Sequence, residues 1–109
     1  MTNLKLPEPI AAYFNADKRD GEAIARCFTT RAIVKDDGQT HCGPAAIKAW
    51  KTEASAKYSY TSEPFAVEEK EGRYVVTSRL TGNFPGSPVD LRFVFRLERG
   101  KIAFLEITP

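Results

Sequence analysis

Cysteine, histidine and long apolar runs are scarce in this sequence, and each shortage argues against a class of protein. The 109 residues include two cysteines and one histidine. These are too few for a disulfide framework or a metal-ligand pattern, so we expect both thiols to be reduced. No apolar run approaches the ~20 residues that a membrane-spanning helix needs, and the N-terminus lacks the apolar core of a signal peptide. We therefore expect a cytoplasmic protein with no membrane as a partner.

Charge of one sign is scarce as well. The formal net charge is +2, without a cluster or stripe of lysine and arginine, which argues against nucleic acid as a partner. The composition is 42% hydrophobic and 28% charged, as in soluble globular proteins. A chain of this length is expected to form one domain, residues 1–109, with a single modest core.

Apolar residues at helical spacing predict two short helices in the first third of the chain. The first covers about residues 8–17, where prolines suit the first turn because its N–H groups have no intrahelical partner. Asp20 is expected to cap the second helix, which carries Ile24, Cys27 and Phe28 on one face. Such short amphipathic helices need a sheet to cover.

A hairpin is predicted in the middle of the chain. Residues 32–36 alternate as a strand, with Val34 and Asp36 on one face. Asp37-Gly38 is a two-residue turn signal, because glycine tolerates a positive φ. Residues 39–42 then return as a short second strand.

The second half of the chain changes its apolar period from 3.6 to 2. Gly43-Pro44 opens a third helix, and the alternation starts near Lys57. The buried stripe of the third helix holds Ile47, Trp50 and Ala54. The alternating segments are residues 58–69, 73–83, 89–99 and 102–108. The order ααββαββββ predicts an α+β fold, a curved antiparallel sheet packed against three N-terminal helices with a cavity between the layers.

These elements carry a resemblance to a known family over about residues 7–109. The chain resembles the SnoaL-like branch of the nuclear transport factor 2-like superfamily, which implies a cone-shaped, cystatin-like α+β roll. The residues that carry the resemblance are 13–17, Phe28 with 32–38, the helix start at 43–47, and the hairpin at 95–102. The superfamily includes cyclases, isomerases, dehydratases, epoxide hydrolases and non-catalytic association domains, so the resemblance implies a fold more than a reaction.

The isomerase branch offers a residue-by-residue comparison. Asp36 matches the position at which that branch has its catalytic base. Ile10 and Phe93 stand where the branch has its two hydrogen-bond donors to the substrate oxygen. Without those donors an enolate would have no evident stabiliser, so ketosteroid isomerisation is not expected.

Asp36, His41 and Tyr13 are the catalytic candidates. Asp36 is interpreted as a base on the pocket wall, or alternatively as an ordinary residue of the turn. His41 could activate water or carry a proton beside it, although a lone histidine on a short strand is more often structural. Tyr13, one helical turn after Ile10, is a weaker candidate donor.

A second group of residues is predicted to contact a ligand. Large aromatic residues at helical spacing are also typical of a core, and Ser78 could either orient a ligand or bond to the backbone. No metal site is expected, because one histidine has no partner at ligand spacing. The predicted ligand-binding residues are Trp50, Tyr58, Ser78, Leu80 and Phe93.

Two functions from different classes fit these residues. The first is a cofactor-independent isomerase, cyclase, hydrolase or lyase that uses Asp36 as acid or base on a small apolar molecule. The second is a non-catalytic ligand-binding or dimerisation domain. A homodimer is expected in either case, because so small a domain buries its surface poorly. The face expected to form it carries Val75, Thr77, Arg92 and Val94.

Overall fold

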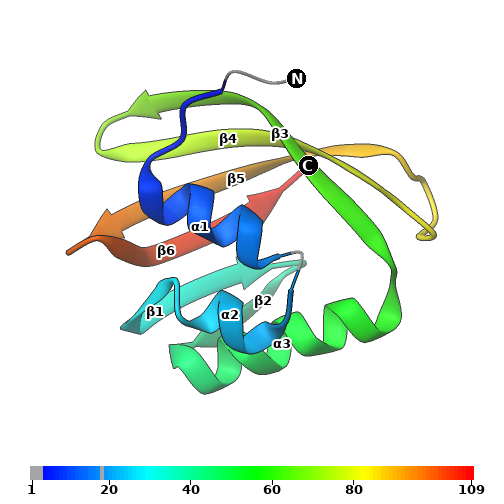
Figure 1. The fold of residues 1–109 in the computed structure, drawn as a ribbon, viewed down its shortest axis with the longest axis horizontal. Coiled ribbons are helices and arrows are strands. Elements are labelled where there is room, and N and C mark those ends of the chain that lie inside the picture. Colours follow the sequence, from blue (N-terminus) through cyan, green and yellow to red (C-terminus); the bar gives the residue numbers. More distant parts are fainter. Residues whose placement is uncertain (1–3, 18) are drawn as a thin grey trace.

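Three helices lie on one face of a six-stranded, curved sheet in the computed structural model, which describes residues 4–17 and 19–109 (Figure 1). This arrangement confirms the predicted α+β class and element order. In chain order the elements are α1 (Glu8–Ala16), α2 (Gly21–Ala25), β1 (Phe28–Asp36), β2 (Gln39–Cys42), α3 (Gly43–Lys57), β3 (Tyr60–Lys70), β4 (Arg73–Gly82), β5 (Val89–Glu98) and β6 (Lys101–Thr108).

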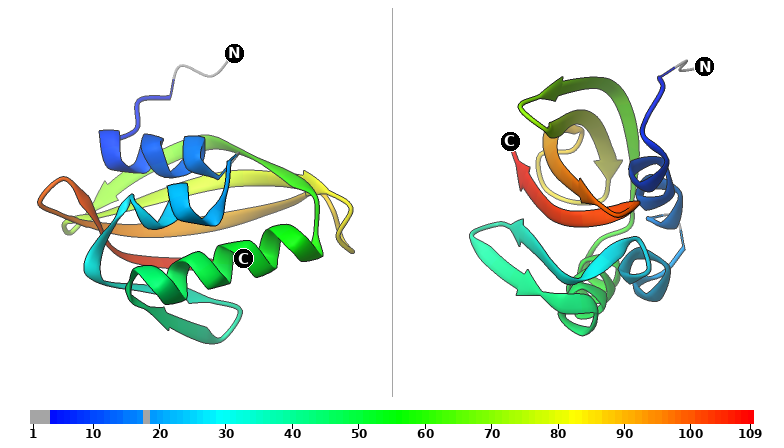
Figure 2. Two further views of the ribbon diagram at one scale, coloured as in Figure 1. Left: turned by 60° about the horizontal axis from the view of Figure 1, so that its bottom comes forward. Right: turned by 90° about the vertical axis from the view of Figure 1, so that its left-hand side faces the viewer.

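The strands follow the order β2-β1-β6-β5-β4-β3 across the sheet, and Figure 2 shows how strongly the sheet curves. All neighbours are antiparallel except β1 and β6, which run parallel. The expectation of a wholly antiparallel sheet was therefore wrong for one pair. After β2, the chain passes through α3 to the far edge, and the run from β3 to β6 returns to β1. The reversals along that run leave β6 pointing the same way as β1.

Two local predictions are confirmed and one boundary is corrected. Asp37 and Gly38 have φ values of 51° and 76° and join β1 to β2, and the Asp20 carboxylate accepts a hydrogen bond from the Ala23 N–H at 2.9 Å. The second helix, however, ends at Ala25, and Phe28 begins β1 instead of extending that helix. Its pairing with β6 explains the difference, because a strand partner outweighs a helical spacing of apolar residues.

The core lies between the helices and the inner face of the sheet. Aromatic rings from α1 and β5 fill one end of it: Tyr13 lies 5.5 Å from Phe95 and Phe14 lies 5.3 Å from Phe93, measured between ring centroids. The helices leave the outer face uncovered (Figure 2). Val75 and Val94 are half-buried on it. Within the described residues, none of the helices is long and apolar enough to cross a membrane.

Candidate functional site

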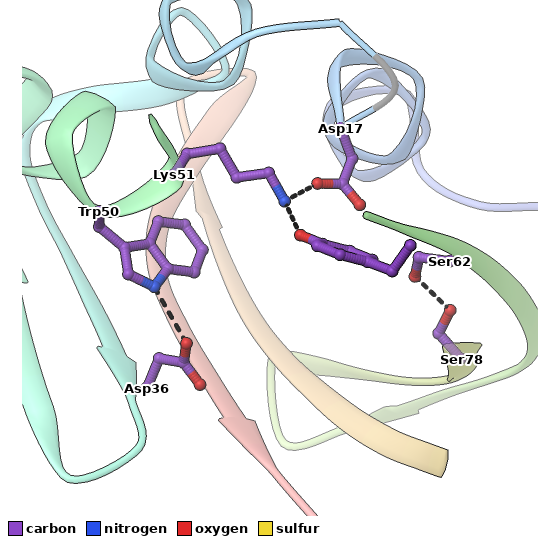
Figure 3. A network of polar contacts seen from close by, with 7 residues as sticks. Asp17, Asp36, Trp50, Lys51, Ser62 and Ser78 are labelled. Atoms are coloured by element: carbon purple, nitrogen blue, oxygen red, sulfur yellow. Dashed lines mark hydrogen bonds and ion pairs between the residues drawn. The ribbon is translucent and has the colours of Figure 1, made fainter. Parts of the chain in front are cut away.

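Asp36 ends β1 on the inner face of the sheet. Alternation along the strand buries Ala32 and Val34 and directs Asp36 the same way. Its Oδ2 accepts a hydrogen bond from the indole Nε1–H of Trp50 in α3, at 3.0 Å (Figure 3). The carboxylate is therefore held between sheet and helix, whereas the neighbouring Asp37 adopts the turn conformation.

A cavity of about 740 Å³ opens beside this carboxylate. Its walls come from the β1–β2 hairpin, the second half of α3, the start of β3, and the facing ends of β4 and β5. Apolar and aromatic side chains share these walls with polar and charged ones, among them Asp37, Glu53 and Lys57. Apolar surface with convergent polar groups is typical of small-molecule sites. The side chains used below are Asp36, His41, Trp50, Tyr58, Tyr60, Leu80, Phe84 and Leu91, all of which line the cavity.

Trp50 connects the two polar candidates of the hairpin. It holds Asp36 through its indole N–H, and its ring lies 5.9 Å from the His41 ring between centroids. His41 pairs across the hairpin with Val34, and Asp36 pairs with Gln39. The structure thus brings five of the predicted site residues to one cavity: Asp36, His41, Trp50, Tyr58 and Leu80.

Three of the predicted site residues lie outside the lining of this cavity. Tyr13 is 2% exposed and packs edge-to-face against Phe14 and Phe95. Phe93 belongs to the same ring cluster. Ser78 is fully buried and shares a 2.7 Å hydrogen bond with the hydroxyl of Ser62 on β3. Tyr13 and Phe93 lie where the rings of α1 pack on the sheet, and Ser78 lies between β4 and β3, so none of the three lines this cavity. Their functional roles stay predictions.

A buried charge cluster that the sequence reading missed lies behind the cavity wall. The Lys51 side chain on α3 is 4% exposed, and its ammonium contacts the Asp17 carboxylate and the Tyr60 hydroxyl (Figure 3). A signal existed: Lys51 stands four residues after Ile47, on the stripe that helical spacing buries. Nothing local pointed to Asp17 as its partner, because the two residues meet only in the folded chain.

Burial shifts the proton affinity of several groups around this wall. Desolvation lowers the pKa of Lys51 to about 8. Burial, and then the nearby Asp36 carboxylate, raises the pKa of Tyr60. Burial is the main cause that raises the pKa of Tyr13 well above its ordinary value, and the nearby Tyr60 and Asp36 raise this pKa further. Both phenols are therefore neutral at physiological pH, while the lysine is still mainly an ammonium.

Nothing in the described ranges resembles a metal centre. Among residues 4–17 and 19–109, no three side chains of histidine, cysteine, aspartate or glutamate come together as a metal ion would require. Hydrogen-bonding and acid–base groups are what this site offers.

A curved sheet with helices on one face and a cavity between the layers defines the fold class of nuclear transport factor 2-like and cystatin-like proteins. The chain belongs to the SnoaL-like domain family, whose model matches residues 10–105. No curated protein matches the chain.

Solved structures give the same fold. A candidate polyketide cyclase from Sinorhizobium meliloti is 38% identical, with a TM-score of 0.90 over 94% of this chain and 95% of that one. A hypothetical protein with a ketosteroid isomerase-like fold from Catenulispora acidiphila, in complex with trimethylamine, is 17% identical, with a TM-score of 0.85 over 96% and 87%. The epoxide hydrolase/cyclase-like enzyme SalBIII, which has a role in pyran ring formation, is 21% identical, with a TM-score of 0.77 over 93% and 87%.

Proposed function

We propose that the cavity beside Asp36 binds a small apolar molecule and that Asp36 acts on it as a cofactor-independent general acid or base. The observation that carries the proposal is a carboxylate fixed by the Trp50 N–H on the wall of a cavity that also has apolar and aromatic walls. Isomerisation, cyclisation, hydrolysis and elimination all use such a group. The similarity to a candidate polyketide cyclase supports this range of chemistry.

The geometry leaves Asp36 able to exchange a proton with a ligand. A carboxylate has two oxygens, and Trp50 occupies Oδ2, so Oδ1 has lone pairs to offer the cavity. The indole bond also fixes the orientation of the acid, which lowers the cost of aligning it with a reacting C–H or O–H group. His41, whose ring lies 5.9 Å from the Trp50 ring between centroids, lines the same cavity.

Proton exchange on a simple carbonyl compound tests the base without knowledge of the natural substrate. In D₂O buffer, 2-tetralone gains deuterium at the carbon next to its carbonyl when a base removes a proton there. We expect the protein to accelerate this exchange, followed by NMR, and Asp36→Asn to lower the acceleration by about 10²-fold or more. Asp90→Asn, the same change on the outer face, is the control and should leave the rate unchanged.

Binding is measured separately, so that loss of catalysis and loss of the cavity are distinguishable. Trp50 is the single tryptophan of the chain and lines the cavity, so its fluorescence reports directly on occupancy by 2-tetralone. Binding without accelerated exchange would favour the non-catalytic ligand-binding domain. Absence of both binding and exchange, for 2-tetralone and for other small cyclic ketones, would refute the proposal.

We also propose that two copies associate through the outer face of the sheet. The helices cover only the inner face, and Val75, Thr77 and Val94 are half-buried among charged neighbours on the outer one. A second copy would cover these apolar groups, which a small domain cannot cover alone. Light scattering at micromolar concentration should give twice the chain mass, and a monomer at that concentration would contradict the proposal.

A further inference from the structure

The Asp17–Lys51 pair is buried, and the energetic cost of burying two charges calls for an explanation. The two side chains are 8% and 4% exposed, and removing two charges from water costs several kcal/mol per ion before their attraction is counted. The pair joins the residue that ends α1 to the middle of α3. An apolar contact could join two helices at least as well, so tying α1 to α3 does not by itself account for an ammonium here.

Tyr60 connects this pair to the cavity. Its ring lies 4.8 Å from the Lys51 Nζ, and its hydroxyl contacts the same nitrogen. Tyr60 lines the cavity, whereas Lys51 and Asp17 do not. The phenol is therefore the one member of the cluster that a bound molecule could touch.

The N–H and O–H protons available to Lys51 and Tyr60 determine which atom donates and which accepts in each hydrogen bond. An ammonium has three N–H donors and no acceptor, so in its contact with Lys51 the Tyr60 oxygen must accept. The Tyr60 hydroxyl proton is then left for a different acceptor. A neighbouring positive charge polarises that O–H and strengthens the hydrogen bond it donates.

Tyr60 also keeps this proton at neutral pH. Burial and the Asp36 carboxylate both raise the pKa of Tyr60, so the phenol stays a donor. Asp36 and Tyr60 both line this cavity. One cavity is thus lined by a residue with a carboxylate base and by a tyrosine whose hydroxyl contacts a buried ammonium.

We infer that Tyr60 donates a hydrogen bond to an oxygen of the ligand, and that Lys51 and Asp17 position and polarise it; this rests on the proposed function of the same cavity. The ligand class is narrowed to apolar molecules that carry a carbonyl, enol or phenol oxygen. Ile10 and Phe93, which are buried and apolar, offer no such donor. Tyr60 supplies it from β3, a different element.

A matched pair of probes isolates the contact with oxygen. Naphthalene and 2-naphthol differ by one hydroxyl, and their affinities for the intact protein can be measured by calorimetry. We expect 2-naphthol to bind about tenfold more tightly than naphthalene, since one good hydrogen bond is worth about that factor. Tyr60→Phe should reduce the preference to about one while leaving naphthalene binding unchanged. Tyr74→Phe, a half-buried tyrosine outside the cavity lining, should keep it.

The roles of Lys51 and Asp17 are tested together, because Lys51→Met alone would leave a buried carboxylate without its partner. The double variant Asp17→Asn with Lys51→Met should lower the preference for 2-naphthol several-fold at constant naphthalene affinity. A merely structural pair would change both affinities equally, and that result would overturn the positioning role.

The remaining outcomes separate this inference from the proposed function. A wild-type preference that survives Tyr60→Phe overturns the inference alone and leaves the cavity as a binding site. If the wild type binds neither probe and no cyclic ketone, the proposed function fails and the inference fails with it. Circular dichroism of each variant shows that it is folded before its affinities are compared.

Discussion

The two ends of the inner sheet face are built from the same strands but are filled differently. Near α1 the space is filled: Tyr13 and Phe14 pack against Phe93 and Phe95. Near the end of α3 it stays open as a cavity of about 740 Å³. The alternation of β5 runs through both ends, so the strand pattern does not decide which end is hollow. The covering helix decides it, because α1 contributes rings and the end of α3 does not.

The two ends also differ in the charged residues that they hold. The filled end holds an uncharged aromatic cluster, whereas the open end has Asp36 on its wall and the Asp17–Lys51 pair behind it. In the low-dielectric interior, hydrogen bonds to buried charges are stronger, and a buried charge without a partner is costly. The filled end is therefore expected to govern stability, and the open end to govern binding.

The largest expected effect compares one phenylalanine at each end. Phe95→Ala removes a fully buried ring from the filled end and should lower the free energy of unfolding by about 3–5 kcal/mol. Phe84→Ala, on the half-exposed wall of the cavity, should lower it by less than about 1.5 kcal/mol. Urea denaturation measures both values. Equal losses of unfolding free energy would mean that the cavity wall stabilises the fold as much as the core does.

The second prediction tests the outer face of the sheet. Val75→Arg places a charge at the centre of the proposed dimer face, next to its cross-strand neighbour Glu68, which can pair with it inside the monomer. We expect the dissociation constant of the dimer to rise by about 100-fold, or about 3 kcal/mol, with little change in the fold. Light scattering over a dilution series measures this, and an unchanged dimer would locate the interface elsewhere.

The third prediction uses pH to probe the buried charges. Burial lowers the pKa of Lys51 to about 8 from 10.5. Between those values the unfolded chain binds more protons than the folded one, so the contribution of Lys51 to stability rises with pH. Relative to the double variant Asp17→Asn with Lys51→Met, the wild type should gain up to about 2 kcal/mol over that window.

Denaturation of both proteins in urea at pH 7, 8, 9 and 10 measures the difference. Cys27 and Tyr13 are present in both proteins, so their own titration largely cancels. Parallel curves would show that the Asp17 carboxylate fully offsets the desolvation of Lys51.

The smallest expected effect comes from the tyrosine of the filled end. Tyr13→Phe keeps the ring and its contacts with Phe14 and Phe95, so the unfolding free energy should change by less than about 1 kcal/mol. Because Tyr13 does not line the cavity, we expect the deuterium exchange of 2-tetralone to continue at the wild-type rate. A large loss of exchange would support the catalytic role predicted from the sequence.

Local patterns predicted most of the fold. The Asp37-Gly38 turn and the alternation from Val89 to Leu97 place their strands correctly, since both depend only on neighbouring residues. The start of β1 at Phe28 was missed because apolar residues at 24, 27 and 28 also fit a helix. The parallel pairing of β1 with β6 was missed because register between distant strands leaves no local trace.

The candidate site was predictable only where strand parity controls it. Parity places Asp36 on the inner face beside Val34, and helical spacing places Trp50 opposite. Tyr60 and Asp17 depend on where α3 ends relative to α1 and β3, which no short window of sequence contains. Their proposed roles rest on tertiary contacts with Lys51.

The parallel pairing of β1 with β6 has a consequence for how the protein is made. The strand that carries Asp36 is held on one side by β2, a near neighbour in sequence, and on the other by Lys101–Thr108. A ribosome makes β6 only after β2, α3 and three further strands have followed β1, so one edge of β1 stays unpaired in the nascent chain until β6 has emerged. Val34 and its apolar neighbours stay accessible to chaperones during that interval. The candidate site can therefore be completed only after nearly all of the sequence shown has emerged.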